Sequence, residues 1–204
     1  YPQEKLTSDR VAIYLHQHDK ALRAGETKRA LSEVEKAYKL DPFFVPTVTR
    51  YADLLLAKGK KKKCAKIIER SWQINPHPEL AEIWHRLTPA PKGKNIDKDN
   101  AKTMQWAEKL LSFNPESVES QIAAARTAMD IEYWGEAKAY LMVAEKIYPS
   151  ASLYRLQAIV EQHSTHNEDS IHRLMERAAD ALPDKVWVCQ ETGMVYDRWS
   201  AIAK

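Results

Sequence analysis

The hexapeptide AYKLDP at Ala37–Pro42 returns as SWQINP at Ser71–Pro76, with the two prolines 34 residues apart. The agreement continues upstream of both hexapeptides at the same spacing. The aligned pairs are Gly25 with Gly59, Ala30 with Cys64, Val34 with Ile68, and Ala37 with Ser71. Self-similarity at a fixed period of this length is the signature of a repeat protein, so this stretch decides the fold.

The same spacing separates Pro115 from Pro149 in the second half of the chain. Ahead of Pro149, small and bulky residues follow the earlier order, at Trp134, Ala137, Leu141 and Ala144. Small side chains allow two helices to cross closely, and a proline after the second helix prevents that helix from continuing. The repeat therefore predicts pairs of antiparallel helices.

This pattern resembles the tetratricopeptide repeat (TPR), most closely over residues 11–78 and 118–149. The resemblance implies an all-α fold, a right-handed α-solenoid of about five helix pairs within residues 1–183. The expected repeat units are 11–44, 45–78, 79–117, 118–150 and 151–183. The third unit is irregular, because its connection at Thr88–Asp97 is long and Leu110 replaces the small residue that the family prefers.

The composition is that of an ordinary soluble protein, with 44% hydrophobic and 29% charged residues among 204. A formal net charge of +3 disfavours nucleic acid as a partner, since such binders carry a strongly basic stripe or domain. Cys64 and Cys189 stand far apart and form no disulfide framework. The sequence has no glycine-rich phosphate loop, GxSxG elbow or HExxH motif. It therefore predicts a protein that is not an enzyme and that binds no metal or cofactor.

In TPR proteins the first helix of each pair lines the concave face of the solenoid, and that face binds protein partners. Carried over to this chain, the groove positions of the family are Leu15, Asp19, Thr49, Asp53, Ile122, Arg126, Met129 and Arg155, and Arg50 is added to this predicted groove. They mix apolar residues with charges of both signs. Leu15 and Asp19 replace the Lys and Asn of the clamp that grips chaperone C-termini, so a chaperone adaptor is disfavoured.

The densest run of charge is Lys60, Lys61, Lys62 and Lys63, at the turn inside the second unit. One interpretation is a solvated turn that leads into a helix. Lysines at a helix N-terminus oppose the helix dipole, however, which favours a second interpretation as a basic cluster with a use. Such a cluster attracts the anionic head groups of a membrane surface.

Residues 184–204 break the repeat pattern and form a C-terminal extension. Two short runs of β-branched and aromatic residues favour strands, with Thr192–Gly193 as the turn between them. The pattern predicts a β-hairpin whose Trp187 and Trp199 pack on the last helix. One thiolate, from Cys189, cannot hold zinc, so the hairpin is expected to be free of metal.

The segments Trp187–Gly193 and Tyr196–Ser200 resemble the tail of HemY-like proteins from alphaproteobacteria. The resemblance implies a TPR protein of the bacterial inner membrane, held by an N-terminal anchor that is missing from this sequence. It also implies late haem-biosynthesis enzymes as partners. Because edge helices of solenoids often pair, a homodimer is a further expectation.

Two other interpretations stay open. A TPR adaptor that regulates lipopolysaccharide assembly in the envelope would carry a complete four-cysteine rubredoxin module. A porphyrin-binding protein would need a deep apolar pocket with a His or Tyr ligand. Both differ from the leading prediction, which is a non-catalytic interaction scaffold.

Overall fold

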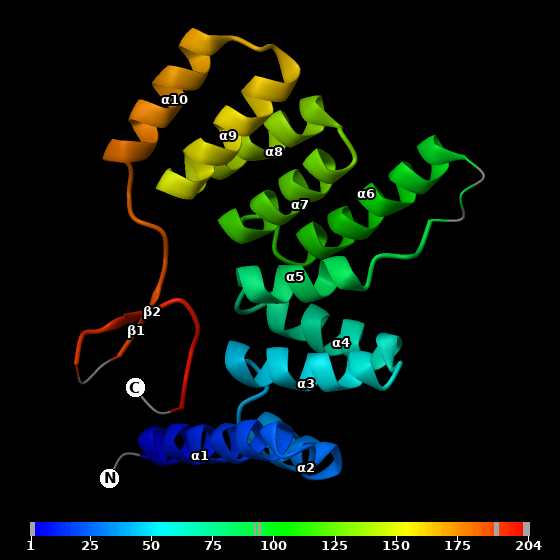
Figure 1. Cartoon of the computed structure of the whole chain (residues 1–204), viewed down its shortest axis with the longest axis vertical. Coiled ribbons are helices and arrows are strands. Elements are labelled where there is room, and N and C mark those ends of the chain that lie inside the picture. The colour runs from blue at the N-terminus through cyan, green and yellow to red at the C-terminus, as the bar shows by residue number, and fades with distance from the viewer. Residues whose placement is uncertain (1–2, 92, 94, 190–191, 202–204) are drawn as a thin grey trace. The chain divides into compact units, whose positions relative to one another are not determined.

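The computed structural model describes residues 3–91, 93, 95–189 and 192–201, and its helices follow one another as antiparallel pairs (Figure 1). The pairs are α1 (Gln3–Arg23) with α2 (Thr27–Leu40), α3 (Val45–Ala57) with α4 (Lys61–Trp72), α5 (Pro78–Arg86) with α6 (Ile96–Phe113), α7 (Val118–Asp130) with α8 (Trp134–Ile147), and α9 (Ala151–Ser164) with α10 (Glu168–Asp180). The predicted all-α fold of about five helix pairs is confirmed.

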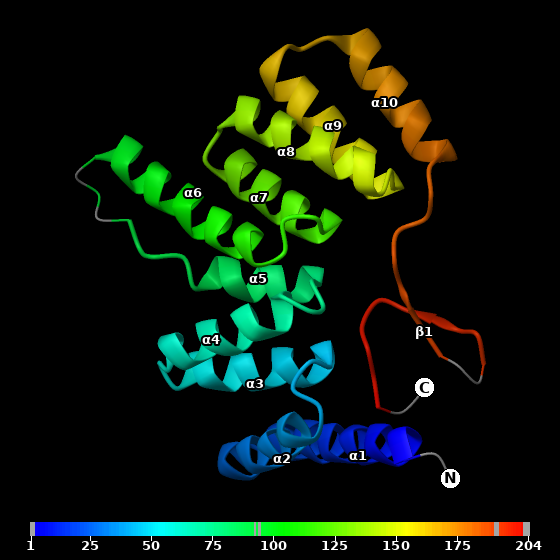
Figure 2. The same ribbon diagram turned by 180° about the vertical axis from the view of Figure 1, so that it is seen from behind.

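The chain divides into two compact units. Unit 1 contains residues 1–75 together with 186–204, and unit 2 contains residues 76–185. In unit 2 the helices from α7 to α10 pack in chain order, each on the next (Figure 2). The C-terminal segment, which the sequence sets apart as an extension, belongs to unit 1 with the first two helix pairs.

A tight turn with one residue at positive φ joins the two helices of four pairs. In unit 1 this residue is Gly25 (φ 76°) or Gly59 (φ 69°), which explains why glycine recurs in the first two repeats. In unit 2 the same left-handed conformation is held by Glu132 (φ 62°) and His166 (φ 55°). The turns of unit 2 therefore keep the same backbone conformation, although they have no glycine at this position.

The second helices share one buried position that follows the repeat spacing. Its occupants are Ala37, Ser71, Leu110, Ala144 and Ala178. Four of the five are small, so most second helices can approach a neighbouring helix closely. The exception is Leu110 of α6, whose side chain is 1% exposed. A larger side chain therefore fills the space at this position of the third pair.

The third pair is also joined in an unusual way, through two tryptophans. The rings of Trp84 on α5 and Trp106 on α6 stack with centroids 4.3 Å apart and an interplanar angle of 9°. Each indole N–H donates to the backbone carbonyl of the other tryptophan, at 2.9 and 3.0 Å. The ammonium of Lys109 lies over both rings. Paired indoles thus connect two helices whose connecting loop is long.

The C-terminal segment forms the predicted hairpin, with β1 (Trp187–Val188) antiparallel to β2 (Val195–Tyr196). The prediction that its tryptophans pack on the last helix is wrong. Trp187 and Trp199 instead meet the ring of Phe44, with centroids 6.5 and 5.3 Å apart in edge-to-face geometry. The hairpin therefore packs within unit 1, on the residue that precedes α3.

Candidate functional site

Two of the nine predicted groove positions are occupied by buried side chains. Leu15 is 0% exposed and belongs to the core of unit 1. Thr49 is 8% exposed, and its hydroxyl donates to the carbonyl of Pro46 in its own helix. Their prediction as partner contacts is corrected, because neither side chain is available to a partner. The apolar side of an amphipathic helix faces the core. The family pattern shows which helix carries a residue, but it does not show whether that residue faces the groove or the core.

In unit 1 the predicted residues Asp19 and Arg50 bind each other. Arg50 Nε donates to Asp19 Oδ1 at 2.8 Å, and Arg50 Nη2 donates to Asp19 Oδ2 at 2.9 Å. This bidentate pair joins the first helices α1 and α3, and its planar geometry is the strongest form of an arginine–carboxylate contact. Asp53, one turn further along α3, is exposed.

A buried histidine lies beside this pair. His18 is 1% exposed, and its Nδ1 lies 2.9 Å from the carbonyl oxygen of Ala30 on α2. Burial is the largest effect and lowers the pKa of His18, and the charge of Arg50 lowers it further. The hydrogen bond to Ala30 and the charges of Asp19 and Asp53 act in the opposite direction. The neutral ring is therefore the form that fits the folded unit.

This burial predicts that acid weakens unit 1. Because the folded pKa lies below the unfolded value near 6.5, stability is complete above that value and falls as pH drops through it toward the folded pKa. We expect His18→Asn, whose amide can still donate to the carbonyl of Ala30, to flatten the fall in urea midpoint between about pH 7 and pH 5. His172→Asn on the exposed surface of α10 is the matched control. An equal pH dependence in wild type and His18→Asn would contradict the assignment.

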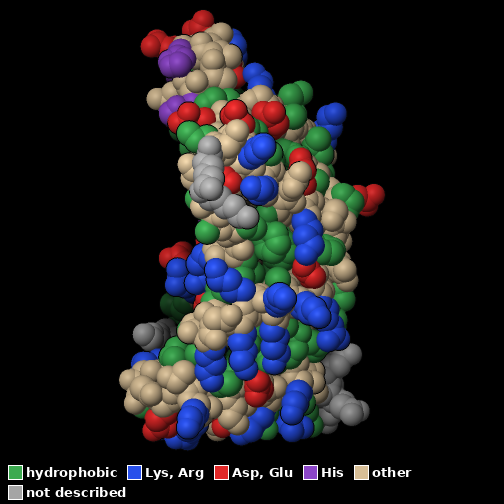
Figure 3. All heavy atoms as spheres, turned by 90° about the vertical axis from the view of Figure 1, so that its right-hand side faces the viewer, with side chains coloured by type: hydrophobic (Ala, Val, Ile, Leu, Met, Phe, Trp, Pro, Cys, Tyr) green, Lys and Arg blue, Asp and Glu red, His purple; other side chains and the backbone are tan. Residues whose placement is uncertain are grey.

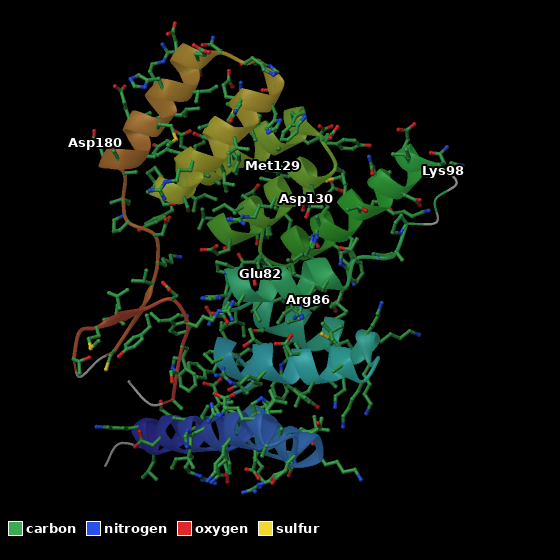
Figure 4. The ribbon with its side chains drawn as sticks, in the orientation of Figure 1. Glu82, Arg86, Lys98, Met129, Asp130 and Asp180 are labelled. Carbon is green, nitrogen blue, oxygen red and sulfur yellow. The ribbon has the colours of Figure 1, made fainter. Side chains whose placement is uncertain are left out.

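In unit 2 the predicted residues Ile122, Arg126 and Met129 lie on α7. Ile122 and Met129 pack against the core, while Arg126 is exposed. Asp130, the neighbour of Met129 at the end of α7, has a carboxylate oxygen 3.9 Å from Nδ1 of His85 on α5, and Figure 4 labels Met129 and Asp130. The surface of this first helix therefore carries the exposed charge of Arg126, with Ile122 and Met129 partly buried beside it.

An acidic residue that the family pattern does not single out completes this face. Glu119 on the first turn of α7 has a raised pKa, because burial outweighs the opposing effects of Lys185 and Arg126. Its carboxylate lies 3.8 Å from the ammonium of Lys185. We call the surface formed by Glu119, Ile122, Arg126, Met129 and Arg155 the α7–α9 face.

The extended stretch Leu182–Lys185 of the same unit contacts two residues of this face, Glu119 and Arg155. The backbone N–H of Ala151 donates to the carbonyl of Leu182 at 3.0 Å, which binds the stretch to the start of α9. The N–H of Ser152 donates to Asp184 Oδ1 at 3.2 Å, and Arg155 lies 3.9 Å from Asp184 Oδ2. Burial opposes ionisation of Asp184, yet the hydrogen bonds from Ser152 outweigh it and lower the pKa.

These contacts show which chemistry the α7–α9 face accepts. It contacts the extended backbone of Leu182–Lys185. The carboxylate of Asp184 lies at the N-terminus of α9, where the helix dipole favours negative charge, and the ammonium of Lys185 lies beside Glu119. Sequence reasoning found Arg155 but missed Glu119 and Asp184. Only the fold brings these residues together, since Asp184 lies 29 residues beyond Arg155 in the chain.

The predicted basic cluster lies at the turn between α3 and α4. Figure 3 shows a face of the molecule on which many Lys and Arg side chains are exposed. All four lysines are exposed, and the ammonium of Lys63 also lies 5.0 Å from the ring centroid of Tyr51. A hydrogen bond with Tyr51 raises the pKa of Lys63. All four lysines therefore reach solvent, and Lys63 also contacts an aromatic ring of its own unit.

Metal binding and membrane spanning can be judged for the described residues. Within this part of the chain, no three or more His, Cys, Asp or Glu side chains are grouped so that they could hold a metal ion. None of the helices in the described ranges is both long and apolar enough to cross a membrane.

No protein-family model matches the sequence. The probable magnetosome protein Mms48 of Magnetospirillum gryphiswaldense is 25% identical over 180 residues. The match covers 87% of this chain and 38% of Mms48, so the chain spans well under half the length of that relative.

Solved structures of TPR proteins resemble the chain in fold. TTC0263, a thermophilic TPR protein of Thermus thermophilus, superposes with a TM-score of 0.50 at 12% identity, covering 84% of this chain and 91% of that one. A MamA structure gives a TM-score of 0.47 at 12% identity over 85% and 92%. YrrB, described as a TPR protein with an unusual peptide-binding site, gives 0.45 at 13% over 82% and 84%. The HemY-like resemblance of the tail stays a prediction, and the fold is that of a TPR-like protein.

Proposed function

We propose that this chain is a protein-interaction scaffold whose α7–α9 face binds an extended segment of a partner protein. The observation that carries the proposal is the stretch Leu182–Lys185, which already lies on this face as an extended segment held by backbone and charge contacts. A surface that binds one such segment has the donors and charges to bind another of similar chemistry.

The side chains on the face indicate the character of the partner segment. Arg126 and Arg155 are exposed, which favours acidic residues in the partner. Ile122 and Met129 lie one turn either side of Arg126 on α7 and are only partly buried, which favours an apolar residue in the partner, and methionine adapts readily to differently shaped partners. The expected ligand is therefore an extended segment that combines carboxylates with an apolar side chain.

Charge reversal on the face tests the proposal. We expect Arg126→Glu with Arg155→Glu to reduce in-cell crosslinking to the main partner about tenfold, because each change replaces attraction for a carboxylate by repulsion. The measurement is crosslinking of the protein in its source cell, followed by mass spectrometry of the captured partners. Helicity by circular dichroism is expected to stay unchanged.

The matched control reverses two exposed lysines on second helices of the same unit. Lys98 lies at the start of α6 and Lys146 in the last turn of α8, so Lys98→Glu with Lys146→Glu gives the same change in net charge (Figure 4 shows Lys98). This control should leave capture within about twofold of the wild type. Equal loss in both double variants would reject the α7–α9 face as the binding site.

For the identity of the partner we propose two alternatives, each supported by a different resemblance. The tail resemblance supports late haem-biosynthesis enzymes at the inner membrane, with the exposed Lys60, Lys61 and Lys62 toward anionic lipid. The likeness to Mms48 supports a role beside magnetosome proteins instead. The same crosslinking experiment separates them, since enrichment of ferrochelatase favours the first form and enrichment of magnetosome proteins favours the second.

A further inference from the structure

Arg50 of unit 1 is held in a way that leaves one surface of its guanidinium group open to an aromatic ring. Its Nε and Nη2 donate to the two carboxylate oxygens of Asp19, and its Nη1 donates to the carbonyl of Pro46 at 3.1 Å. These three bonds use the edge of the planar group and fix its orientation. The flat side of an arginine held in this way stacks well on aromatic rings.

A separate set of hydrogen bonds fixes the backbone at Phe44. Asp41 Oδ1 accepts hydrogen bonds from the backbone N–H groups of Phe43 and Phe44, at 2.9 and 3.0 Å. This turn sets the backbone that enters α3, where Phe44 is the residue that precedes the helix. Phe44 and Arg50 thus stand at one end of the same first helix, each positioned by an aspartate. We call these two residues with Asp19 the Arg50 site.

The occupant of the Arg50 site is a tryptophan from the C-terminal segment. The indole of Trp199 meets the ring of Phe44 at a centroid distance of 5.3 Å, and Arg50 Cζ lies 5.4 Å from the Trp199 ring. Trp187 makes a second edge-to-face contact with Phe44 at 6.5 Å. Both contacts are of the kinds that tryptophan makes better than other side chains.

The hairpin that carries these tryptophans is short, and much of it is exposed. Each of its strands has two residues, and isolated two-stranded hairpins are marginally stable in water. Trp187 and Trp199 are only half-buried, and the outward Val188 and Val195 are 54% and 60% exposed. The segment therefore has the size and exposure of a bound ligand rather than of a core element.

We propose that the Arg50 site is a tryptophan-recognition site for partner proteins, and that the C-terminal hairpin of this chain is its intramolecular ligand. A partner segment that presents an indole binds by taking the place of Trp199. Because the hairpin is part of the same chain, its high effective concentration keeps the site closed to weak ligands. The site lies in unit 1 and does not depend on the proposed function of the α7–α9 face.

A competition experiment on the full chain tests this proposal. The probe is a fluorophore-labelled synthetic peptide of residues 186–201, and the measurement is its dissociation constant by fluorescence anisotropy. The variant Trp187→Ala with Trp199→Ala removes the intramolecular ligand and is expected to bind the peptide at least about tenfold more tightly than the wild-type chain. A peptide in which both tryptophans are alanine should bind neither chain.

Adding Arg50→Lys to the double variant tests the role of the guanidinium. Lysine keeps the positive charge near Asp19 but lacks a planar group, so peptide affinity is expected to fall about threefold to fivefold. Circular dichroism checks that each variant keeps its helices. If the double variant loses helicity, Trp199→Leu replaces it, with the same expected order of affinities.

Three results would overturn the proposal. The first is equal affinity of the peptide for the wild-type chain and the variant without tryptophans in its tail. The second is no binding to that variant while its helicity is intact. The third is equal binding of the peptide without tryptophans, which would mean that the indole is not what the Arg50 site recognises.

Discussion

Replacing Trp84 by alanine is expected to destabilise unit 2 by about 3–5 kcal/mol, the usual cost of truncating a buried tryptophan. Trp84 is 2% exposed, and its indole both stacks on Trp106 and donates to the carbonyl of that residue. The change also leaves the Trp106 ring without its stacking partner. The loss in free energy of unfolding is measured by urea-induced unfolding, followed by circular dichroism.

The control is another tryptophan of unit 2 that is not fully buried. Trp134 at the start of α8 is half-buried, and its ring stacks on His163 at 4.6 Å. Trp134→Ala is expected to cost about 1 kcal/mol, in line with the loss of one partly exposed aromatic pair. If both substitutions cost the same, the paired indoles of Trp84 and Trp106 do not hold the third helix pair together.

The sequence predicted those parts of the fold that repeat. A spacing of 34 residues recurs because the buried small positions, the turns and the terminating prolines must each return once per helix pair. Gly25 and Gly59 mark the turn in unit 1, and the absence of glycine at Glu132 and His166 shows how the same turn can escape notice. Periodic constraints of this kind are visible without coordinates.

Features that occur once could not be predicted in this way. None of the other four second helices has a tryptophan at the position of Trp106, and nothing in the local sequence indicates that Trp106 pairs with a residue 22 positions earlier. The pattern of the tail predicts Trp187 and Trp199 on the last helix, yet both rings contact Phe44. Contacts between distant segments depend on how the helix pairs stack, which a local pattern does not encode.

The residues of the candidate site show the same difference between repeating features, which the sequence predicts, and unique contacts, which it does not. The family pattern indicated Arg126 and Arg155 on first helices, and both side chains are exposed, whereas Arg50, which was added to the predicted groove, is partly buried in a pair with Asp19. It did not indicate that Arg50 is already bound to Asp19. The positions came from a repeating pattern, whereas the partners of these side chains come from unique contacts.

The second large effect is expected where the chain departs from the repeat. Leu110 occupies the position that is Ala or Ser in the other four second helices, so Leu110→Ala restores the residue type typical of the family. A consensus argument predicts that this change stabilises the protein. We predict the opposite, a loss of about 2–5 kcal/mol, because Leu110 is 1% exposed and its removal leaves a cavity.

The reverse substitution in the next pair provides the matched test. Ala144 stands 34 residues beyond Leu110 and is 0% exposed, so Ala144→Leu forces a larger side chain into a close helix contact. It is expected to cost about 1–3 kcal/mol through overpacking. Both free energies come from urea unfolding of the full chain. A stabilising Leu110→Ala would mean that the third pair can close to regular TPR packing, and that the paired tryptophans rather than Leu110 set the spacing of its helices.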